Sequence, residues 1–438
     1  MNIEKSLAMQ KKAAALIPGM TQLLSKRPDM FSYGVWPGYY SRAEGCEVWD
    51  LDGNRYTDMS IAGIGANILG YAVPEVDDAV RRAIAAGSSS SLNCPEEVEL
   101  AELLCELHPW AKMARFTRGG GESMAVAVRI ARAHTCRDRI AFCGYHGWHD
   151  WYLAANVGTE DALGEHLLSG LSPSGVPRGL KGTALPFRYN QPEELEAIAK
   201  KYPGELAAIV MEPIRNSPPA PGFFETVRRI ADETGAVLIV DEISAGLRMN
   251  TGGAHLKIGL HPDIAVFSKS LGNGYPIGAV IGKREVMQAA QCTFISSTCW
   301  TERTGPAAAV ATLRRHRELD AGPYLMKLGE SVQAGWQAAA DKHGIHVHVG
   351  GLPAMSHFSF EHETPLALKA LFVQLMLEKG FLATTAYYAM AAHRQEHVTA
   401  YLKAVDSVFA EMAVIIAGKS VMKHLKGRPA SAGFKRLT

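Results

Sequence analysis

Two stretches decide the fold of this chain: Ala236-Val237-Leu238-Ile239-Val240-Asp241 and Ile264-Ala265-Val266-Phe267-Ser268-Lys269. Each is an apolar run that ends in a charged residue, a pattern typical of strands buried on both faces of a parallel sheet. The second run leads into the glycine-rich turn Gly272-Asn273-Gly274-Tyr275-Pro276. Ligands of such sheets bind where the strands end at their carboxyl edge. We therefore expect Asp241 and Lys269 to lie at one ligand site.

The two residue types suit one kind of chemistry. A carboxylate at that edge can keep a pyridine nitrogen protonated, because the opposite charges stabilise each other. A lysine there can form a Schiff base with an aldehyde, and burial makes it a better nucleophile by disfavouring its charge. Each of the two residues is in the kind of place where a pyridoxal phosphate enzyme would put it. The alternative is a buried ion pair between Asp241 and Lys269 with no catalytic role.

The composition excludes several classes of protein. The chain has 438 residues, of which 47% are hydrophobic and 20% charged, as expected for a folded globular protein larger than one simple core. A net charge of +1 without a basic stripe argues against a nucleic-acid partner. No stretch resembles a membrane span or a signal peptide. Seven scattered cysteines without a Cys-x-x-Cys pair favour reduced thiols in the cytoplasm.

The middle of the chain alternates between helices and apolar strands, which predicts a parallel sheet. The expected strands cover residues 139–144, 206–212, 236–242, 264–268 and 278–281. The segment 158–186 is rich in Gly, Ser and Pro and predicts a long surface loop. Asp52-Gly53 lies between two short strand-like runs and predicts a hairpin turn.

A glycine-rich stretch, Arg118-Gly119-Gly120-Gly121-Glu122, runs into a helix expected to begin near Ser123. Glycines let backbone N–H groups approach an anion, and the helix N-terminus favours negative charge. A tight turn without a ligand is the alternative.

The next strand ends in Tyr145-His146-Gly147-Trp148-His149. Tyr145 can stack on a flat heterocycle, although core packing is the alternative. For His149 we expect a surface polar role, with the same alternative open for His146. The two histidines lack a third ligand, so we expect no metal site. Glu212 is expected at a strand end because Pro213 stops the ladder.

Together these motifs resemble the class III (fold type I) pyridoxal-phosphate aminotransferases, most of all the branch that contains glutamate-1-semialdehyde 2,1-aminomutase. Asp241-Glu242-Ile243 followed by Gly246-Leu247-Arg248 matches one family pattern. Lys269 with its following glycines and proline matches the pattern Lys-x-x-Gly-x-Gly-x-Pro. The resemblance extends over nearly the whole chain. It implies a large cofactor-binding domain at 76–325 with a mostly parallel sheet, and a smaller α+β domain built from 1–75 and 326–438.

The resemblance also implies a role for each matching residue. Lys269 would form the Schiff base with pyridoxal 5′-phosphate and move protons, and Asp241 would hold the ring nitrogen. The remaining cofactor-binding residues would be Tyr145 and Ile243 on the two ring faces, Gly120 and Gly121 at the phosphate, Glu212 at the site, and Thr298 from the neighbouring subunit of a homodimer.

Some positions depart from the family. Gly119-Gly120-Gly121-Glu122 stands where the family usually has Ser-Gly-(Ser/Thr)-Glu, so the loop lacks the usual hydroxyls. Residues 298–306 and 387–393 differ from the aminomutase pattern. We therefore expect an aminotransferase that moves an amino group from a primary amine or amino acid to a carbonyl acceptor. The alternatives are an intramolecular 2,1-aminomutase and a non-catalytic cofactor-binding protein. Candidates for binding a substrate carboxylate are Arg42, Arg215 and Arg303.

Overall fold

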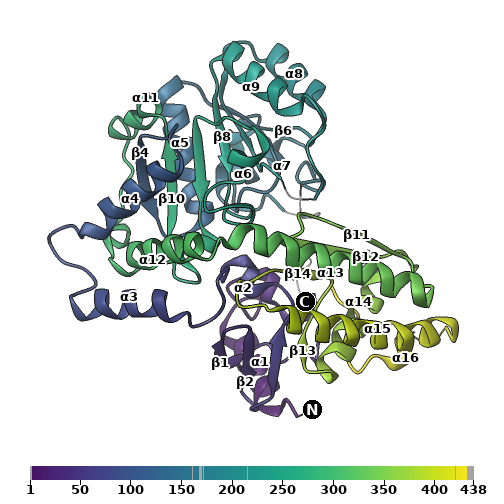
Figure 1. Ribbon diagram of the computed structural model, residues 1–438. Helices are drawn as coiled ribbons and strands as arrows, with labels where there is room; N and C mark the ends of the chain where they lie inside the picture. The colour runs from purple at the N-terminus through teal and green to yellow at the C-terminus, as the bar shows by residue number, and fades with distance from the viewer. Residues whose placement is uncertain are drawn as a thin grey trace. The chain divides into compact units, whose positions relative to one another are not determined.

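The chain folds into two compact units, shown in Figure 1. One unit comprises Pro74–Gly322, and the other combines Met1–Val73 with Pro323–Thr438. The computed structural model describes residues 2–159, 161–166, 170, 172–214, 216–419 and 421–431. Among the helices of these residues, none has both the length and the apolar character needed to cross a membrane.

The unit Pro74–Gly322 is built on a seven-stranded sheet. In spatial order its strands are β4 (Met113–Thr117), β10 (Gly278–Gly282), β9 (Ile264–Phe267), β8 (Val237–Asp241), β7 (Leu206–Met211), β5 (Arg139–Cys143) and β6 (Ala184–Pro186). Only β10 runs antiparallel to its neighbours. The five predicted strands are confirmed to within one residue at each end, and the mostly parallel sheet is confirmed.

The predicted loop over 158–186 is confirmed for its described residues between 159 and 183, apart from the 3₁₀ turn η3 (Arg178–Leu180), but it is wrong at its end. Ala184–Pro186 forms the edge strand β6 beside β5, and Leu163 and Val176 are buried. A three-residue strand bonded on one side only gives too short an apolar run to stand out in a Gly-, Ser- and Pro-rich context. Residues 160, 167–169 and 171 of this segment lie outside the described residues.

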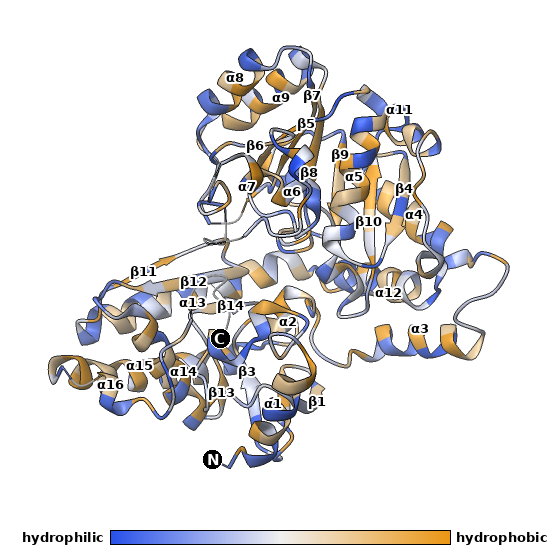
Figure 2. Cartoon of the chain, turned by 180° about the vertical axis from the view of Figure 1, so that it is seen from behind, coloured by the Kyte–Doolittle hydropathy of each residue, from blue (hydrophilic) through white to orange (hydrophobic). Residues whose placement is uncertain are grey.

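Alternate residues of the central strands face opposite sides of the sheet. Ile239 of β8 packs in a core with α5 (Gly120–Thr135), whereas Leu238 and Val240 pack with α9 (Phe223–Thr234). The apolar strands lie between these helices in Figure 2. Both faces are covered, which explains why the strands read as continuous apolar runs rather than alternating ones.

Of the other helices in the described part of this unit, two precede its first strand in the sequence, four lie between strands, and two follow its last strand. They are α3 (Pro74–Ala85), α4 (Pro95–Leu107), α6 (Asp150–Leu153), α7 (Ala155–Gly158), α8 (Pro192–Lys201), α10 (His255–Ile258), α11 (Arg284–Met287) and α12 (Thr304–Glu318).

The second unit combines both ends of the chain. The predicted hairpin at Asp52-Gly53 is confirmed, since β2 (Glu47–Asp50) pairs antiparallel with β3 (Arg55–Asp58). A strand from the C-terminal part, β13 (Phe381–Leu382), then pairs parallel with β3. The remaining elements are α1 (Glu4–Leu16), α2 (Ala62–Gly65), β1 (Tyr40–Glu44), α13 (Ala321–His343), β11 (Val347–Gly350), β12 (Met355–Phe360), α14 (Pro365–Glu378), β14 (Ala386–Tyr388), α15 (Gln395–Ala417) and α16 (Val421–His424).

Candidate active site

Asp241 is the last residue of β8, and its side chain is buried at 3% exposure. Its Oδ2 lies 2.8 Å from Nδ1 of His146, and its Oδ1 accepts a hydrogen bond from the Ile243 backbone N–H at 3.0 Å. Burial raises the pKa of Asp241, and the hydrogen bond with His146 opposes that rise. The alternative of a surface position for His146 is wrong, because this side chain is 1% exposed.

The hydrogen bonds of His146 fix the proton content of the pair. Its Nδ1 faces the Asp241 carboxyl, and its Nε2 lies 3.0 Å from the Cys143 carbonyl oxygen. A neutral imidazole has one N–H, so it cannot donate to both oxygens. Two protons are therefore shared by Asp241 and His146, as imidazolium with carboxylate or as imidazole with carboxylic acid. In either form the pair has no net charge.

Lys269 begins the 3₁₀-helix η4 (Lys269–Gly272), two residues after the end of β9. Its φ is 38°, a backbone conformation that costs free energy for a residue with a side chain. Its Nζ donates a hydrogen bond of 2.7 Å to Oγ of Ser244. Ser244 follows Asp241 by three residues, so the two strand ends meet through this bond. Ser244 could not be predicted, because a serine after a buried strand is common.

The glycine stretch lies inside the helix rather than before it. The predicted start at Ser123 is corrected, because α5 begins at Gly120 and its N-cap residue is Gly119. The first N–H groups of a helix have no partner within it, so those of Gly120 and Gly121 are available to an anion. A Cβ atom on Gly120 would lie 3.0 Å from Cδ1 of Ile243. Ile243 therefore packs against the start of α5.

Tyr145 and Glu212 lie at the same edge of the sheet, after β5 and β7. The Tyr145 backbone N–H donates to Oε2 of Glu212 at 3.1 Å. The Tyr145 ring meets Tyr152 edge-on, with 6.0 Å between ring centroids. Glu212 is buried, and a Cβ atom on Gly144 would lie 2.7 Å from its Oε2. The carboxylate is thus fixed against the backbone beside Tyr145.

Two of the three arginines considered for binding a substrate carboxylate are paired with carboxylates of the protein. Arg303 makes a double contact with Glu96, with N–O distances of 2.8–3.0 Å. Arg42 forms an exposed ion pair with Glu44. Arg215 lies outside the described residues.

The comparisons with known proteins can be set against this geometry. The family described as Aminotransferase class-III matches residues 32–394. A 3-aminobutyryl-CoA aminotransferase of Cloacimonas acidaminovorans is 31% identical, with 94% of this chain and 98% of the relative covered. A glutamate-1-semialdehyde 2,1-aminomutase of Psychrobacter cryohalolentis is 34% identical, with 87% and 93% covered. This chain belongs to the class III aminotransferases.

The likeness extends to solved structures. The FumI protein of Sphingopyxis sp. MTA144, solved with pyridoxal phosphate, has a TM-score of 0.86 at 26% identity, with 97% of this chain and 98% of that chain covered. The predicted family, the fold type I architecture and the pyridoxal phosphate cofactor are therefore confirmed. The aminotransferase is an enzyme, so the reading as a non-catalytic cofactor-binding protein is set aside.

The residues of this aminotransferase fit the cofactor. A buried carboxyl whose pKa is raised gains from a neighbouring cation, and a protonated ring nitrogen is one. The α5 N-terminus offers N–H groups for a phosphate, and a Cβ atom at Gly120 or Gly121 would lie only 3.0 or 3.1 Å from Ile243 or His149. An amine, Lys269 Nζ, follows the neighbouring strand.

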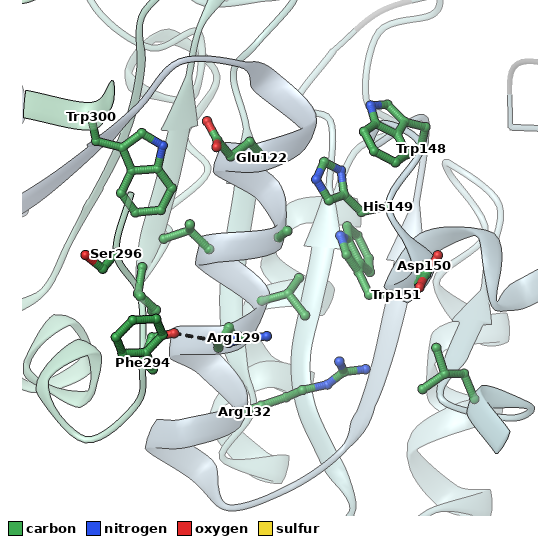
Figure 3. A pocket seen from close by; sticks show the side chains of 15 residues that line it. Glu122, Arg129, Arg132, Trp148, His149, Asp150, Trp151, Phe294, Ser296 and Trp300 are labelled. Atoms are coloured by element: carbon green, nitrogen blue, oxygen red, sulfur yellow. Dashed lines mark hydrogen bonds between the residues drawn. The ribbon is translucent and has the colours of Figure 1, made fainter. Parts of the chain in front are cut away.

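His149 was expected to be a surface polar group, and it is only partly exposed. Its side chain is half-buried, and its Nδ1 is buried without a hydrogen-bond partner. Figure 3 shows it beside the first turn of α5, at a cavity of about 580 Å³ whose aromatic lining consists of Trp148, Trp151, Phe294 and Trp300. The sequence feature that could have indicated His149 is its position four residues after Tyr145 and two residues after Gly147.

Proposed function

We propose that Lys269 is the Schiff-base lysine of this aminotransferase and that Asp241 is the partner of the cofactor's ring nitrogen. The observation that carries the proposal is the position of the two residues on neighbouring parallel strands. Asp241 of β8 pairs in register with Val266 of β9, three residues before Lys269. Lys269 Nζ also donates a hydrogen bond to Ser244, which follows Asp241 by three residues, so the two strand ends lie close together.

The chain's own residues then have separate tasks. Bound pyridoxal phosphate supplies an aldehyde that takes up the amino group and a ring that delocalises negative charge. Lys269 Nζ removes the proton from the donor carbon that bears the amino group and delivers it during transfer. Ser244 Oγ orients that nitrogen through the 2.7 Å hydrogen bond. Asp241 would accept a hydrogen bond from the protonated ring nitrogen of the cofactor, while His146 holds Oδ2 of the same carboxyl group in place.

Further residues bind and enclose the cofactor. Tyr145 and Ile243 cover the two ring faces, and Gly120 and Gly121 bind the phosphate through their backbone N–H groups. Glu212 lines the site and fixes the backbone of Tyr145 through the 3.1 Å hydrogen bond. Pro74–Gly322 is then the cofactor-binding domain, since all these residues belong to it.

The variant Lys269→Ala tests this assignment. We expect it to abolish transfer between a primary amine and a carbonyl acceptor while leaving the thermal unfolding temperature close to that of the wild type. The matched control is Lys257→Ala, which removes an exposed lysine of α10 in the same unit. Turnover at the wild-type rate in Lys269→Ala would exclude Lys269 as the reacting amine.

We further propose that two copies of the chain form a homodimer that shares its active sites. Trp148 and Phe294, at 69% and 84% exposure, border the cavity in Figure 3, and apolar side chains of this size are usually covered. Thr298 is exposed four residues after Phe294, consistent with a contact to the partner's cofactor phosphate.

The variant Thr298→Ala tests the shared site. A hydrogen bond to a charged phosphate contributes about 1.5–3 kcal/mol, so cofactor affinity should fall roughly ten- to a hundredfold. Sedimentation over a dilution series should show cofactor release as the dimer dissociates. A monomer that keeps tight cofactor would contradict the shared site.

Intramolecular amino transfer of the 2,1-aminomutase type is the second candidate, and it is supported by 34% identity to a glutamate-1-semialdehyde 2,1-aminomutase. Incubation with glutamate-1-semialdehyde separates the two reactions, because only a mutase forms product in one turnover without a carbonyl acceptor. We also propose a cytoplasmic location, because all seven cysteines are free thiols.

A further inference from the structure

Thr298 lies in a segment that its own side chains do little to hold. The four residues 296–299 are all exposed, so they bury almost no surface that could fix their backbone. A hydroxyl on such a segment can reach a ligand in a defined geometry only if the backbone is held from elsewhere. The residues that hold it come from β4, α5 and the turn between them, more than 160 positions away in the sequence.

Two arginines hold the backbone on the N-terminal side of residues 296–299. Arg129 Nη1 of α5 donates a hydrogen bond of 3.1 Å to the carbonyl oxygen of Phe294, which is the dashed line in Figure 3. Arg115 of β4 donates to the carbonyl oxygen of the next residue, Ile295. Both donors are charged, which makes these hydrogen bonds stronger than those between neutral groups.

Arg118 holds the other side of the segment. Its Nη2 donates to the carbonyl oxygen of Trp300 at 3.0 Å and to that of Glu302, so one nitrogen joins the two carbonyls. The Glu302 carboxylate accepts the Thr304 backbone N–H at 2.8 Å, at the start of α12. Thr298 therefore lies between two anchored ends, and Arg118 bonds to the nearer of them.

The backbone of Arg118 belongs to the other end of this connection. Arg118 directly follows β4, and its N–H donates to Oε2 of Glu122 at 2.8 Å. The next residue, Gly119, is the N-cap of α5. A Cβ atom on Gly305 would lie 3.4 Å from Arg118 Cζ, so the guanidinium also packs against the first turn of α12. Arg118 is thus fixed at both ends of its side chain.

We propose that Arg118 positions Thr298 for the cofactor phosphate of the partner subunit, so that cofactor binding in one subunit depends on the arginine of the other. The inference rests on the proposed function, in which Thr298 contacts the partner's cofactor phosphate. Arg118 is a positioning residue, because it acts through Thr298 and needs no contact with the cofactor. Its backbone N–H, which bonds Glu122, is retained whatever side chain stands at position 118.

A double-mutant cycle tests whether Arg118 acts through Thr298. Dissociation constants of pyridoxal phosphate are measured for the wild type, Arg118→Met, Thr298→Ala and the double variant. We expect Arg118→Met to weaken binding about three- to thirtyfold, less than Thr298→Ala does, because a misplaced hydroxyl loses only part of its bond. The double variant should bind within about twofold of Thr298→Ala alone. The affinity for pyridoxal, which has no phosphate, should change less than about twofold in Arg118→Met.

The matched control is Arg137→Met. Arg137 belongs to the same unit and also donates to two backbone carbonyls, those of Leu206 at 3.1 Å and Thr234 at 2.6 Å. Leu206 begins β7 and Thr234 ends α9, so these bonds lie at the amino edge of the sheet, away from Asp241. We expect Arg137→Met to lower the thermal unfolding temperature as much as Arg118→Met does and to leave the affinity for pyridoxal phosphate unchanged.

Mixed dimers test the dependence of one subunit on the other. One subunit carries Lys269→Ala, so the Schiff-base absorbance reports only the site of the intact subunit. Arg118→Met is then placed either in the Lys269→Ala subunit or in the intact one. We expect weaker cofactor binding at the reporting site only when Arg118→Met is in the Lys269→Ala subunit. In cofactor-free Arg118→Met homodimers, hydrogen exchange should be faster over residues 297–302 than in the wild type.

The possible failures are distinct. If Thr298→Ala binds pyridoxal phosphate as tightly as the wild type, the shared site of the proposed function is wrong and the inference falls with it. If Thr298→Ala weakens binding and Arg118→Met does not, only the positioning role is overturned. Weaker binding when Arg118→Met is in the intact subunit would place its effect at its own phosphate site and would also overturn the inference. If Arg118→Met does not fold, Arg118→Lys, which keeps the charge and shortens the reach, replaces it in each comparison.

Discussion

Two consecutive residues, Asp241 and Glu242, each bond a buried histidine, and the two pairs differ in what surrounds them. Asp241 Oδ2 lies 2.8 Å from His146 Nδ1, and Glu242 Oε1 lies 2.7 Å from His255 Nδ1. All four side chains are nearly inaccessible to solvent. The two pairs therefore contain the same chemical groups, and they differ in the hydrogen-bond partners around them.

The Glu242 pair is complete within the protein. Its carboxylate also accepts the backbone N–H groups of Ala254 and His255 at 3.0 and 2.9 Å. Nε2 of His255 accepts the indole N–H of Trp110 at 3.1 Å, so this imidazole is neutral with its proton on Nδ1. Each of these donors therefore faces an acceptor, and each acceptor faces a donor. The pair fixes the chain after β8 and offers nothing to a ligand.

The Asp241 pair carries one proton more. Both nitrogens of His146 face acceptors, so the pair is satisfied only when two protons are shared. The Glu242 pair keeps a net negative charge that three N–H groups stabilise. The Glu242 pair is thus surrounded by donors that its carboxylate satisfies, whereas the Asp241 pair faces the Cys143 carbonyl acceptor and needs a second proton to be satisfied.

The largest effect should come from the structural pair. Glu242→Gln places an amide NH₂ against N–H donors, so the free energy of unfolding should fall by about 3–5 kcal/mol, because buried N–H groups lose their charged acceptor. Urea titration of the cofactor-free protein measures it. The rate per folded molecule should stay near that of the wild type. Full stability in this variant would mean that the Glu242 pair is not the structural one.

The next largest effect should come from Asp241→Asn. Loss of the charged acceptor should lower kcat at least about a hundredfold at matched cofactor occupancy, equivalent to about 3 kcal/mol. The free energy of unfolding should change by only about 1 kcal/mol, because burial already raises the pKa of Asp241 and its ionised form adds little to folding. If Asp241→Asn unfolds the protein and Glu242→Gln does not, the two roles must be exchanged.

A third prediction concerns pH and His108, which stacks on His255 at 5.4 Å. Burial lowers the pKa of His108 from its ordinary value of 6.5 to about 4. The unfolded chain therefore binds a proton between these values that the folded chain does not, and stability falls as pH drops from about 6.5 to 4. The loss attributable to His108 should be roughly 2–3 kcal/mol.

Urea titrations at several pH values, for wild type and His108→Asn, isolate this contribution. The variant should lose less stability than the wild type over this acid range. His316 and His393 also have pKa values lowered to about 4 by burial and supply a common background in both proteins. Parallel curves for the two proteins would show that His108 does not titrate in this way.

The smallest effect should come from His146→Phe. The hydrogen bond from His146 lowers the pKa of Asp241, so its removal lets burial raise that pKa further. A carboxyl with a higher pKa ionises only at higher pH, so the acid limb of the kcat profile should move to higher pH. We expect kcat near neutral pH to fall about tenfold. An unchanged profile would leave His146 with a packing role only.

The strands of the central sheet could be predicted because their signal is local. An apolar run that ends in Asp241 or Lys269 reflects burial on both faces of the sheet, and the consecutive apolar residues indicate this burial directly. The edge strand Ala184–Pro186 could not be predicted, because three residues bonded on one side leave no such run. The start of α5 was placed three residues late, because Gly120 and Gly121 are poor helix formers in an isolated chain.

The sequence by itself determined the family, the order of the strands along the chain and the two charged residues at their ends, because these depend on residue type and spacing. Only the tertiary structure brought His146 to Asp241 across 95 positions and Arg303 to Glu96 across 207. It also set Ser244 against Lys269 and His149 against Gly121. Such contacts depend on which loops lie together at the carboxyl edge of the sheet. The residues adjacent in the sequence do not indicate which loops these are.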